Sequence, residues 1–204
     1  MTIRIAVLAS GRGSDFQSII DGIEKGEVDA RIEIMITDNP NAGAIERAKK
    51  HGIPYRIIER KSYSSREEHD LEIMRELDKH NLDLVVLAGY MRIIKAREFL
   101  EKYKWRIINI HPSLLPKYAG AHAQRDAFEA GEKVSGYTIH FVDENLDGGP
   151  IIYQEEVDIS DCKTADEVAS KILQREHIGL PKIVDSFAKG RYEVVGGKVI
   201  YKKD

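Results

Sequence analysis

The sequence predicts an α/β fold, in which an open, mostly parallel twisted sheet is flanked by helices and followed by C-terminal antiparallel strands and a hairpin. Two observations predict it. Short apolar runs alternate with amphipathic stretches through the first half of the chain, which is typical of strands that helices cover on both faces. From about residue 134 the pattern changes to strand-like runs, one long helical stretch and a Gly-Gly turn.

Five apolar runs are the predicted strands of the parallel part. They span residues 3–9, 32–37, 55–58, 84–88 and 107–110. Between them, apolar residues recur at helical spacing. These residues are Phe16, Ile19, Ile20 and Ile23 in one segment and Leu71, Met74 and Leu77 in another. Ligands of open α/β sheets bind beyond the carboxyl ends of the strands, so the loops at 10–14, 89–92 and 109–116 are candidate site loops.

The C-terminal part predicts two more strands, at 134–142 and 150–159, around the turn DENLDGG. A long helix should begin at about Thr164, which forms a capping box with Glu167. The segment 191–203 then predicts a hairpin.

Composition predicts the class of protein. With 204 residues and 42% hydrophobic content, the chain can bury the core of one domain, residues 1–204. Because the 31 basic residues are nearly balanced by 34 acidic ones, we expect no nucleic acid or membrane partner. The one cysteine, Cys162, excludes an internal disulfide and is typical of a cytoplasmic protein. No signal peptide or membrane-length apolar run is present.

The loop ASGRGSDFQ joins the first strand to the first helix, and Ser14 with Gln17 fits a capping box that begins the helix. A helix N-terminus offers N–H groups and a positive dipole end to a phosphate. The loop begins a G-x-G-x-x-G motif, but Phe16 occupies the third glycine position. Asp38 ends the second strand, where a ribose-binding acid would stand. Phosphate binding is favoured, while a nicotinamide dinucleotide and a turn without ligand stay open.

Three polar residues near strand ends are candidate catalytic groups. Asn109 and His111 are two residues apart, so they should share one face of their strand. Asp147 lies in LDGGP, where its ordinary role is to form a turn. The histidines show no metal-ligand spacing, and no nucleophile motif is present. An Asn, His and Asp set can polarise a carbonyl and move a proton without metal or covalent catalysis.

Glu176 falls on the apolar stripe of the long C-terminal helix, an expensive position for a carboxylate without a partner. It either reaches solvent beside a kink at Pro181, or it binds a ribose hydroxyl or an ammonium group of a substrate.

Six motifs stand in order between residues 10 and 177: SGRGS, SREEHD, LAGYMRII, NIHPSLLPKYAG, GYTIHFVDENLDGGPII and QREH. In these motifs the chain resembles the phosphoribosylglycinamide formyltransferases, the folate-dependent enzymes of purine biosynthesis. The resemblance implies a Rossmann-like formyltransferase fold. It also implies transfer of a formyl group from the co-substrate 10-formyltetrahydrofolate to phosphoribosylglycinamide, with no metal.

The resemblance further implies the site residues. The catalytic trio would be Asn109, His111 and Asp147. Phosphoribosylglycinamide would bind at Gly13, Ser14, Asp15 and Glu176. The folate would bind at Arg66, Met91, Arg92, Ile93, Ile94 and Asn109 and at Asp143, Glu144, Asn145, Leu146 and Asp147. The acceptor part would then span about 1–100, and the folate-binding and catalytic part about 84–204.

The chain departs from the family at Asp15, where the family usually has Asn. A carboxylate suits the helix dipole but would repel a phosphate that its side chain faced. Related formyltransferases of tRNA and related folate hydrolases carry a further domain, which we do not expect here. A hydrolase, another amine acceptor, a non-catalytic folate-binding module and a homodimer stay open.

Overall fold

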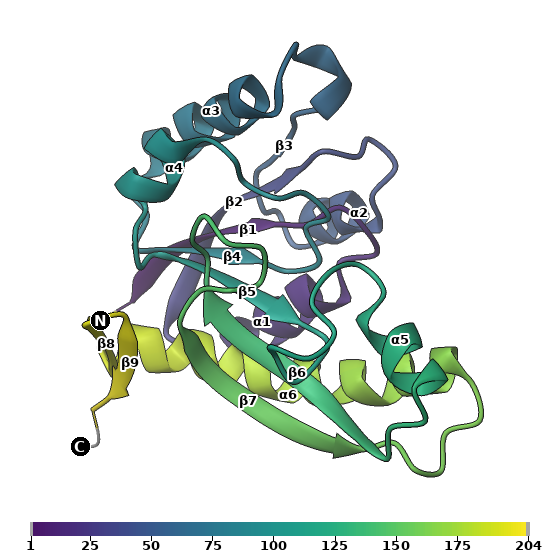
Figure 1. Cartoon of the computed structure of the whole chain (residues 1–204). Coiled ribbons are helices and arrows are strands. Elements are labelled where there is room, and N and C mark those ends of the chain that lie inside the picture. Colours follow the sequence, from purple (N-terminus) through teal and green to yellow (C-terminus); the bar gives the residue numbers. More distant parts are fainter. Residues whose placement is uncertain (1, 203–204) are drawn as a thin grey trace.

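The computed structural model describes residues 2–202, and within this part of the chain seven strands form one sheet in the order β3-β2-β1-β4-β5-β6-β7 (Figure 1). The strands are β1 (Ile3–Leu8), β2 (Ala30–Thr37), β3 (Tyr55–Ile57), β4 (Leu84–Leu87), β5 (Ile107–His111), β6 (Val134–Phe141) and β7 (Ile151–Asp158). All pairings from β3 to β5 are parallel, and β6 pairs antiparallel with both neighbours. The predicted fold class is confirmed.

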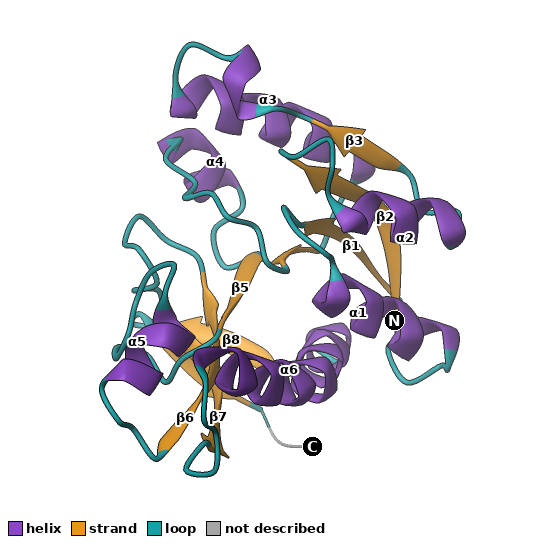
Figure 2. Ribbon diagram, turned by 90° about the vertical axis from the view of Figure 1, so that its right-hand side faces the viewer, coloured by secondary structure: helices purple, strands orange, loops and turns teal. Residues whose placement is uncertain are grey.

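Helices cover both faces of this sheet (Figure 2). One face carries α1 (Ser14–Glu24), α2 (Gly43–Lys50) and α6 (Ala165–Ala188), and the other carries α3 (Arg66–Leu77) and α4 (Arg97–Lys102). The short α5 (Ala123–Glu129) packs against α6. Single 3-10 turns span Arg60–Ser62 and Asp78–His80. The predicted C-terminal hairpin is β8 (Tyr192–Val195) and β9 (Lys198–Tyr201); its predicted last residue, Lys203, lies outside the described residues.

The first strand shows why the apolar runs are continuous. Ile5 and Val7 pack into the core beneath α1, α2 and α6, whereas Ala6 and Leu8 pack into the core beneath α3 and α4. All four side chains are fully buried. Because successive side chains of a strand point to opposite faces, a strand covered on both faces needs apolar residues at every position.

The predicted capping box at Ser14 is wrong. The N-cap of α1 is Gly13, in the left-handed conformation at φ 71°, and no side chain in the described chain caps the helix. Gln17 turns away and donates to Asp21. The box predicted at Thr164 is confirmed, since the N–H of Glu167 donates to the Thr164 hydroxyl and α6 begins at the next residue. That helix continues through Pro181 to Ala188.

The three candidate loops lie side by side at the carboxyl ends of the parallel strands. The strand order reverses between β1 and β4, which lie side by side, and ligands of such sheets bind at this reversal. There the N–H of Ser10 donates to the carbonyl of Gly89. Strand β5 extends to His111, one residue beyond the prediction, because His111 still pairs with Thr138 of β6. The neighbouring strands therefore bring the three loops together.

Candidate active site

Asn109 lies in β5 directly opposite His140 of β6. The Asn109 amide nitrogen is 3.2 Å from Nε2 of His140, and Nδ1 of His140 is 2.8 Å from the carbonyl oxygen of Phe141. A carbonyl only accepts, so Nδ1 carries the proton of His140 and Nε2 accepts from Asn109. Burial lowers the pKa of His140, because a buried imidazole is harder to charge. His140 therefore fixes which way the Asn109 amide points.

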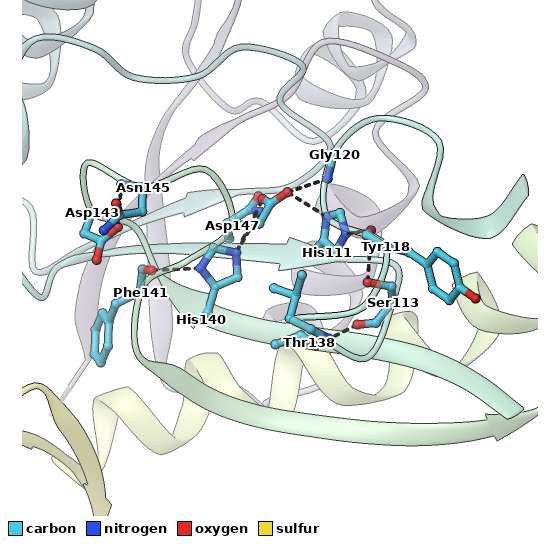
Figure 3. A network of polar contacts seen from close by, with 12 residues as sticks. His111, Ser113, Tyr118, Gly120, Thr138, His140, Phe141, Asp143, Asn145 and Asp147 are labelled. Carbon is cyan, nitrogen blue, oxygen red and sulfur yellow. Dashed lines mark hydrogen bonds and ion pairs between the residues drawn. The ribbon is translucent and has the colours of Figure 1, made fainter. Parts of the chain in front are cut away.

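His111 is buried at the end of β5. Its Nε2 is 2.9 Å from the Tyr118 carbonyl oxygen and therefore donates to it. Its Nδ1 lies 3.5 Å from Oδ2 of Asp147 (Figure 3). Because Nε2 carries the proton that bonds the carbonyl, Nδ1 is the nitrogen that faces the carboxylate of Asp147.

Asp147 lies between the two histidines (Figure 3). Its Oδ2 accepts from the N–H of Gly120 at 2.9 Å, and its Oδ1 is 3.8 Å from Nε2 of His140. The side chain is 10% exposed, and the residue has a left-handed φ of 50°. The expected trio is thus brought together, although Asp147 comes from a turn 36 positions after His111.

The exit from β5 is held by a chain of hydrogen bonds behind the trio (Figure 3). The hydroxyl of Thr138 donates to the carbonyl of Ser113 at 2.6 Å and accepts from the N–H of Leu115 at 3.1 Å. The Ser113 hydroxyl donates to the carbonyl of Lys117 at 2.6 Å. The position of the Tyr118 carbonyl, and with it the orientation of His111, follows from this network.

His140 and the backbone groups of Tyr118 and Gly120 were not among the site residues predicted from the sequence. A signal for His140 was present, since it stands two residues after Thr138 in the motif GYTIHFV and so shares its strand face. For the two backbone groups the sequence holds no comparable signal.

The glycine loop is built for close packing. A Cβ on Gly13 would lie 2.8 Å from Cβ of Ala44 in α2, and the left-handed φ of 71° also favours glycine. Asp15 follows in the first turn of α1 and is 8% exposed. Its Oδ1 has no hydrogen-bond partner in the described part of the chain. Burial raises the pKa of Asp15 to about 7, because the charged form loses its hydration.

Glu176 is 5% exposed where α6 packs against α1, so the alternative in which it reaches solvent is wrong. Burial, and then the neighbouring charge of Asp15, raise its pKa well above the usual range. Nε2 of His177 lies 3.7 Å from Oδ1 of Asp15, too far for a hydrogen bond, and is itself buried without such a partner among residues 2–202. Two carboxyl groups and an imidazole therefore meet at the helix junction.

The folate candidates after β4 divide into exposed and buried residues. Met91 and Ile93 are 65% and 37% exposed, and with Arg92 they line a cavity of about 110 Å³. Arg66, the first residue of α3, lines the same cavity, so the structure brings it to this loop. Ile94 is 3% exposed and packs into the core beneath α3 and α4. Its side chain supports the loop from below.

The candidates at 143–147 form one turn. Asp143 accepts from the N–H of Asn145 at 2.8 Å, and Glu144, Asn145 and Leu146 are exposed. Asp147 closes the turn and points to the histidines (Figure 3). Of this segment, Asp147 is the residue with a direct contact to another member of the trio.

Asp38 is occupied by the chain itself. Its Oδ1 accepts from the Ser10 hydroxyl and its Oδ2 from the Arg92 guanidinium, both at 2.6 Å. It is 8% exposed. The acid that a dinucleotide would need for its ribose is therefore engaged in loop packing.

Across residues 2–202, no group of three or more His, Cys, Asp or Glu side chains is arranged to hold a metal ion. The helices of the same part of the chain include none that is both long and apolar enough to cross a membrane.

The similarity to known proteins identifies the family of the chain. A family model described as formyl transferase matches residues 3–184. The chain belongs to the formyl transferase family. The resemblance seen in the motifs is thereby confirmed, and the fold agrees, since a crystal structure of glycinamide ribonucleotide transformylase 1 from Symbiobacterium toebii superposes with a TM-score of 0.95. That structure is 39% identical and the match covers 99% of this chain and 95% of that one.

Relatives of this family member differ in length. The phosphoribosylglycinamide formyltransferase of Escherichia coli strain K12 is 38% identical over 192 residues, which is 94% of this chain and 90% of that protein. A trifunctional purine biosynthetic protein adenosine-3 of Chironomus tentans is 44% identical over 189 residues. The match covers 92% of this chain but 14% of the length of that protein.

Proposed function

We propose that this formyltransferase transfers the formyl group of 10-formyltetrahydrofolate to the amine of phosphoribosylglycinamide in purine biosynthesis. The observation that carries the proposal is the arrangement of Asn109, His111 and Asp147 at the carboxyl ends of the strands. The chain also matches the phosphoribosylglycinamide formyltransferase of Escherichia coli over nearly its whole length.

The donors for the reacting carbonyl come from β5. When the amine attacks, negative charge develops on the formyl oxygen, and donors aimed there stabilise the transition state more than the substrate. One N–H of the Asn109 amide is held by His140, and the second has no hydrogen bond among residues 2–202. This second N–H is a preorganised donor. His111 supplies the other donor from Nδ1, since the Tyr118 carbonyl already occupies Nε2.

Asp147 supports the charge on His111 and moves the proton. Its carboxylate is 3.5 Å from Nδ1 and is held by the N–H of Gly120. Directly or through a water, it takes a proton from the attacking amine and delivers it to the leaving folate nitrogen. No covalent bond to the protein is needed.

The two substrates would use different elements. The N–H groups at the start of α1, from Gly13 onward, suit the phosphate, and Glu176 suits the ribose hydroxyls. The loop 91–94, with exposed Met91 and Ile93, suits a flat apolar ring, and Arg66 suits the folate carboxylates. A protonated Asp15 would offer the phosphate a donor in place of the usual Asn.

Several further expectations stay predictions. One is the single domain 1–204, with its acceptor part at about 1–100 and its folate-binding and catalytic part at about 84–204. The others are a metal-free reaction, a cytoplasmic location, the absence of nucleic acid and membrane partners, and a homodimer.

An assay with competing acceptors tests the proposal. The protein is mixed with 10-formyltetrahydrofolate and, separately, with phosphoribosylglycinamide, initiator tRNA or no amine. We expect formyl transfer to phosphoribosylglycinamide alone, and its loss in His111→Ala. Formylation of the tRNA, or equal loss of the formyl group to water, would overturn the proposal.

A further inference from the structure

Asp38 lies one strand away from the point where the strand order of the sheet reverses, which is between β1 and β4. It follows the end of β2, which borders β1, and β1 borders β4. Its side chain is 3% exposed. Both carboxylate oxygens are engaged, Oδ1 by the Ser10 hydroxyl and Oδ2 by Nε of Arg92. Two donors, one on each oxygen, hold this buried carboxylate in one position and link it to both neighbouring loops.

Ser10 extends this joint to a second loop. While its hydroxyl donates to Asp38, the same oxygen accepts the N–H of Met91 at 2.9 Å. The N–H of Ser10 donates to the carbonyl of Gly89 at 3.0 Å, and its own carbonyl accepts from the Asn39 amide at 3.0 Å. The loop after β1 and the loop after β4 are thus bonded to each other and to the end of β2.

The two loops belong to different substrates. Ser10 stands three residues before Gly13, where the acceptor phosphate is expected, and Met91 and Arg92 lie in the loop expected to bind the folate. The Arg92 side chain is 50% exposed and lines the cavity of the folate loop, while its Nε binds Asp38. The loop after β4 and the loop after β1 are therefore joined through Arg92, Asp38 and Ser10.

We propose that Asp38 is a positioning residue that couples the two substrate sites, so that binding of the folate improves binding of the acceptor and the reverse. The proposal rests on the function given above. Coupling between sites needs a physical link that both ligands bias, and the Ser10–Asp38–Arg92 chain is such a link.

An amide cannot replace this carboxylate. Asp38 accepts from two donors, one on each oxygen. An Asn has one acceptor oxygen and one amino group and carries no charge. In Asp38→Asn the Arg92 guanidinium therefore meets either a donor or a neutral oxygen, whereas the Ser10 hydroxyl can accept from the amino group. The link is then weakened at Arg92 while the size of the side chain is kept.

Ligand binding is measured by calorimetry with tetrahydrofolate and phosphoribosylglycinamide, a pair that holds no formyl group and does not react. Each dissociation constant is determined alone and with the other ligand saturating, and the ratio is the coupling factor. By linkage the two ratios must agree. We expect a factor of about five or more in wild type, in the usual range for coupled sites, and a factor near one in Asp38→Asn.

Two variants accompany it. Ser10→Ala keeps Asp38 and Arg92 but removes the bridge, so it should also bring the coupling factor near one. This variant also tests the link if Asp38→Asn fails to fold. Asp83→Asn is the matched control, because Asp83 also binds another strand, through the N–H of Arg4 at the opposite edge of the sheet. It should keep the wild-type factor.

The coupling factor distinguishes a positioning role of Asp38 from a general loss of stability. A general loss of stability would lower the melting temperature without changing the coupling factor. An uncoupled wild type, or wild-type coupling in both Asp38→Asn and Ser10→Ala, overturns the proposal. Failure of wild type to formylate phosphoribosylglycinamide overturns the proposed function instead, so the two failures are distinguishable.

Discussion

The two halves of the site differ in how their polar groups are satisfied. At the ends of β5 and β6, Asn109, His111, His140 and Asp147 all have hydrogen-bond partners in the chain. At the junction of α1 and α6, Oδ1 of Asp15 and Nε2 of His177 are buried without hydrogen-bond partners among residues 2–202, and the pKa of Glu176 is raised by burial.

This difference separates two tasks. Paired groups stand ready before the substrate arrives, so they lower the barrier without being reoriented. Buried groups without partners cost stability and recover it when a ligand supplies the missing partner. The β5–β6 half should therefore govern turnover, and the α1–α6 half should govern acceptor affinity.

The largest effect is expected in the paired half. Asp147→Asn keeps the shape but removes the charge that supports a protonated His111. Loss of such electrostatic stabilisation typically costs about 2.7–4 kcal/mol, or on the order of a hundred- to a thousandfold in rate. Single-turnover rates measure it, with folate affinity determined separately and expected to change little.

The double variant tests whether the pair acts as a unit. Groups acting together are non-additive, so His111→Ala combined with Asp147→Asn should lose much less than the product of the two single effects. A near-normal rate in Asp147→Asn, or the full product in the double variant, would show that the 3.5 Å approach has no catalytic meaning.

The next effect concerns the acceptor. Glu176→Ala should raise the Michaelis constant for phosphoribosylglycinamide by roughly two- to tenfold, because a hydrogen bond of a neutral carboxyl group is worth about 0.5–1.5 kcal/mol. Folate affinity should stay nearly constant. Lys171→Ala on the exposed side of the same helix is the control, and equal weakening of both ligands in Glu176→Ala would contradict the assignment.

The third effect is on stability, and its sign follows from burial. The pKa of Asp15 is raised from 3.8 to about 7 in the fold, so the folded chain keeps a proton that the unfolded chain releases near pH 4. The free energy of unfolding should therefore fall as pH rises from about 4 to 7. Each pKa unit is worth about 1.4 kcal/mol, so the rise from 3.8 to about 7 corresponds to a loss on the order of 4 kcal/mol.

Asp15→Asn removes this titration. Urea unfolding at pH 5 and pH 8 should show a flatter profile than wild type, with the variant more stable at pH 8. Parallel profiles for the two proteins would mean that Asp15 ionises at little cost, and the contrast between the two halves of the site would then be lost.

The smallest effect distinguishes the ends of the two helices. Thr164→Ala removes the N-cap of α6 and should cost about 1 kcal/mol. Ser14→Ala should change stability by about 0.5 kcal/mol or less, because Gly13 and not Ser14 occupies the N-cap of α1. Equal losses in thermal unfolding would argue for a cap at Ser14 after all.

The strands could be predicted from the sequence more closely than the helix caps. Ile5 to Leu8 are apolar at every position because helices cover both faces, and that pattern is visible without a structure. The capping pattern of Ser14 and Gln17 was equally visible but misleading. Gly13 had to adopt a left-handed conformation and pack against Ala44, and this contact with α2 overrides the local preference.

The sequence by itself determined the alternation of strands and helices, the family motifs, and Asn109 and His111 on one strand face, because each is a matter of local spacing. Only the tertiary structure decided that His140 orients Asn109, that the Tyr118 carbonyl selects the proton of His111, and that Asp38 joins the two substrate loops. These contacts join residues on separate elements, and their partners are set by strand order and register, which local spacing does not encode.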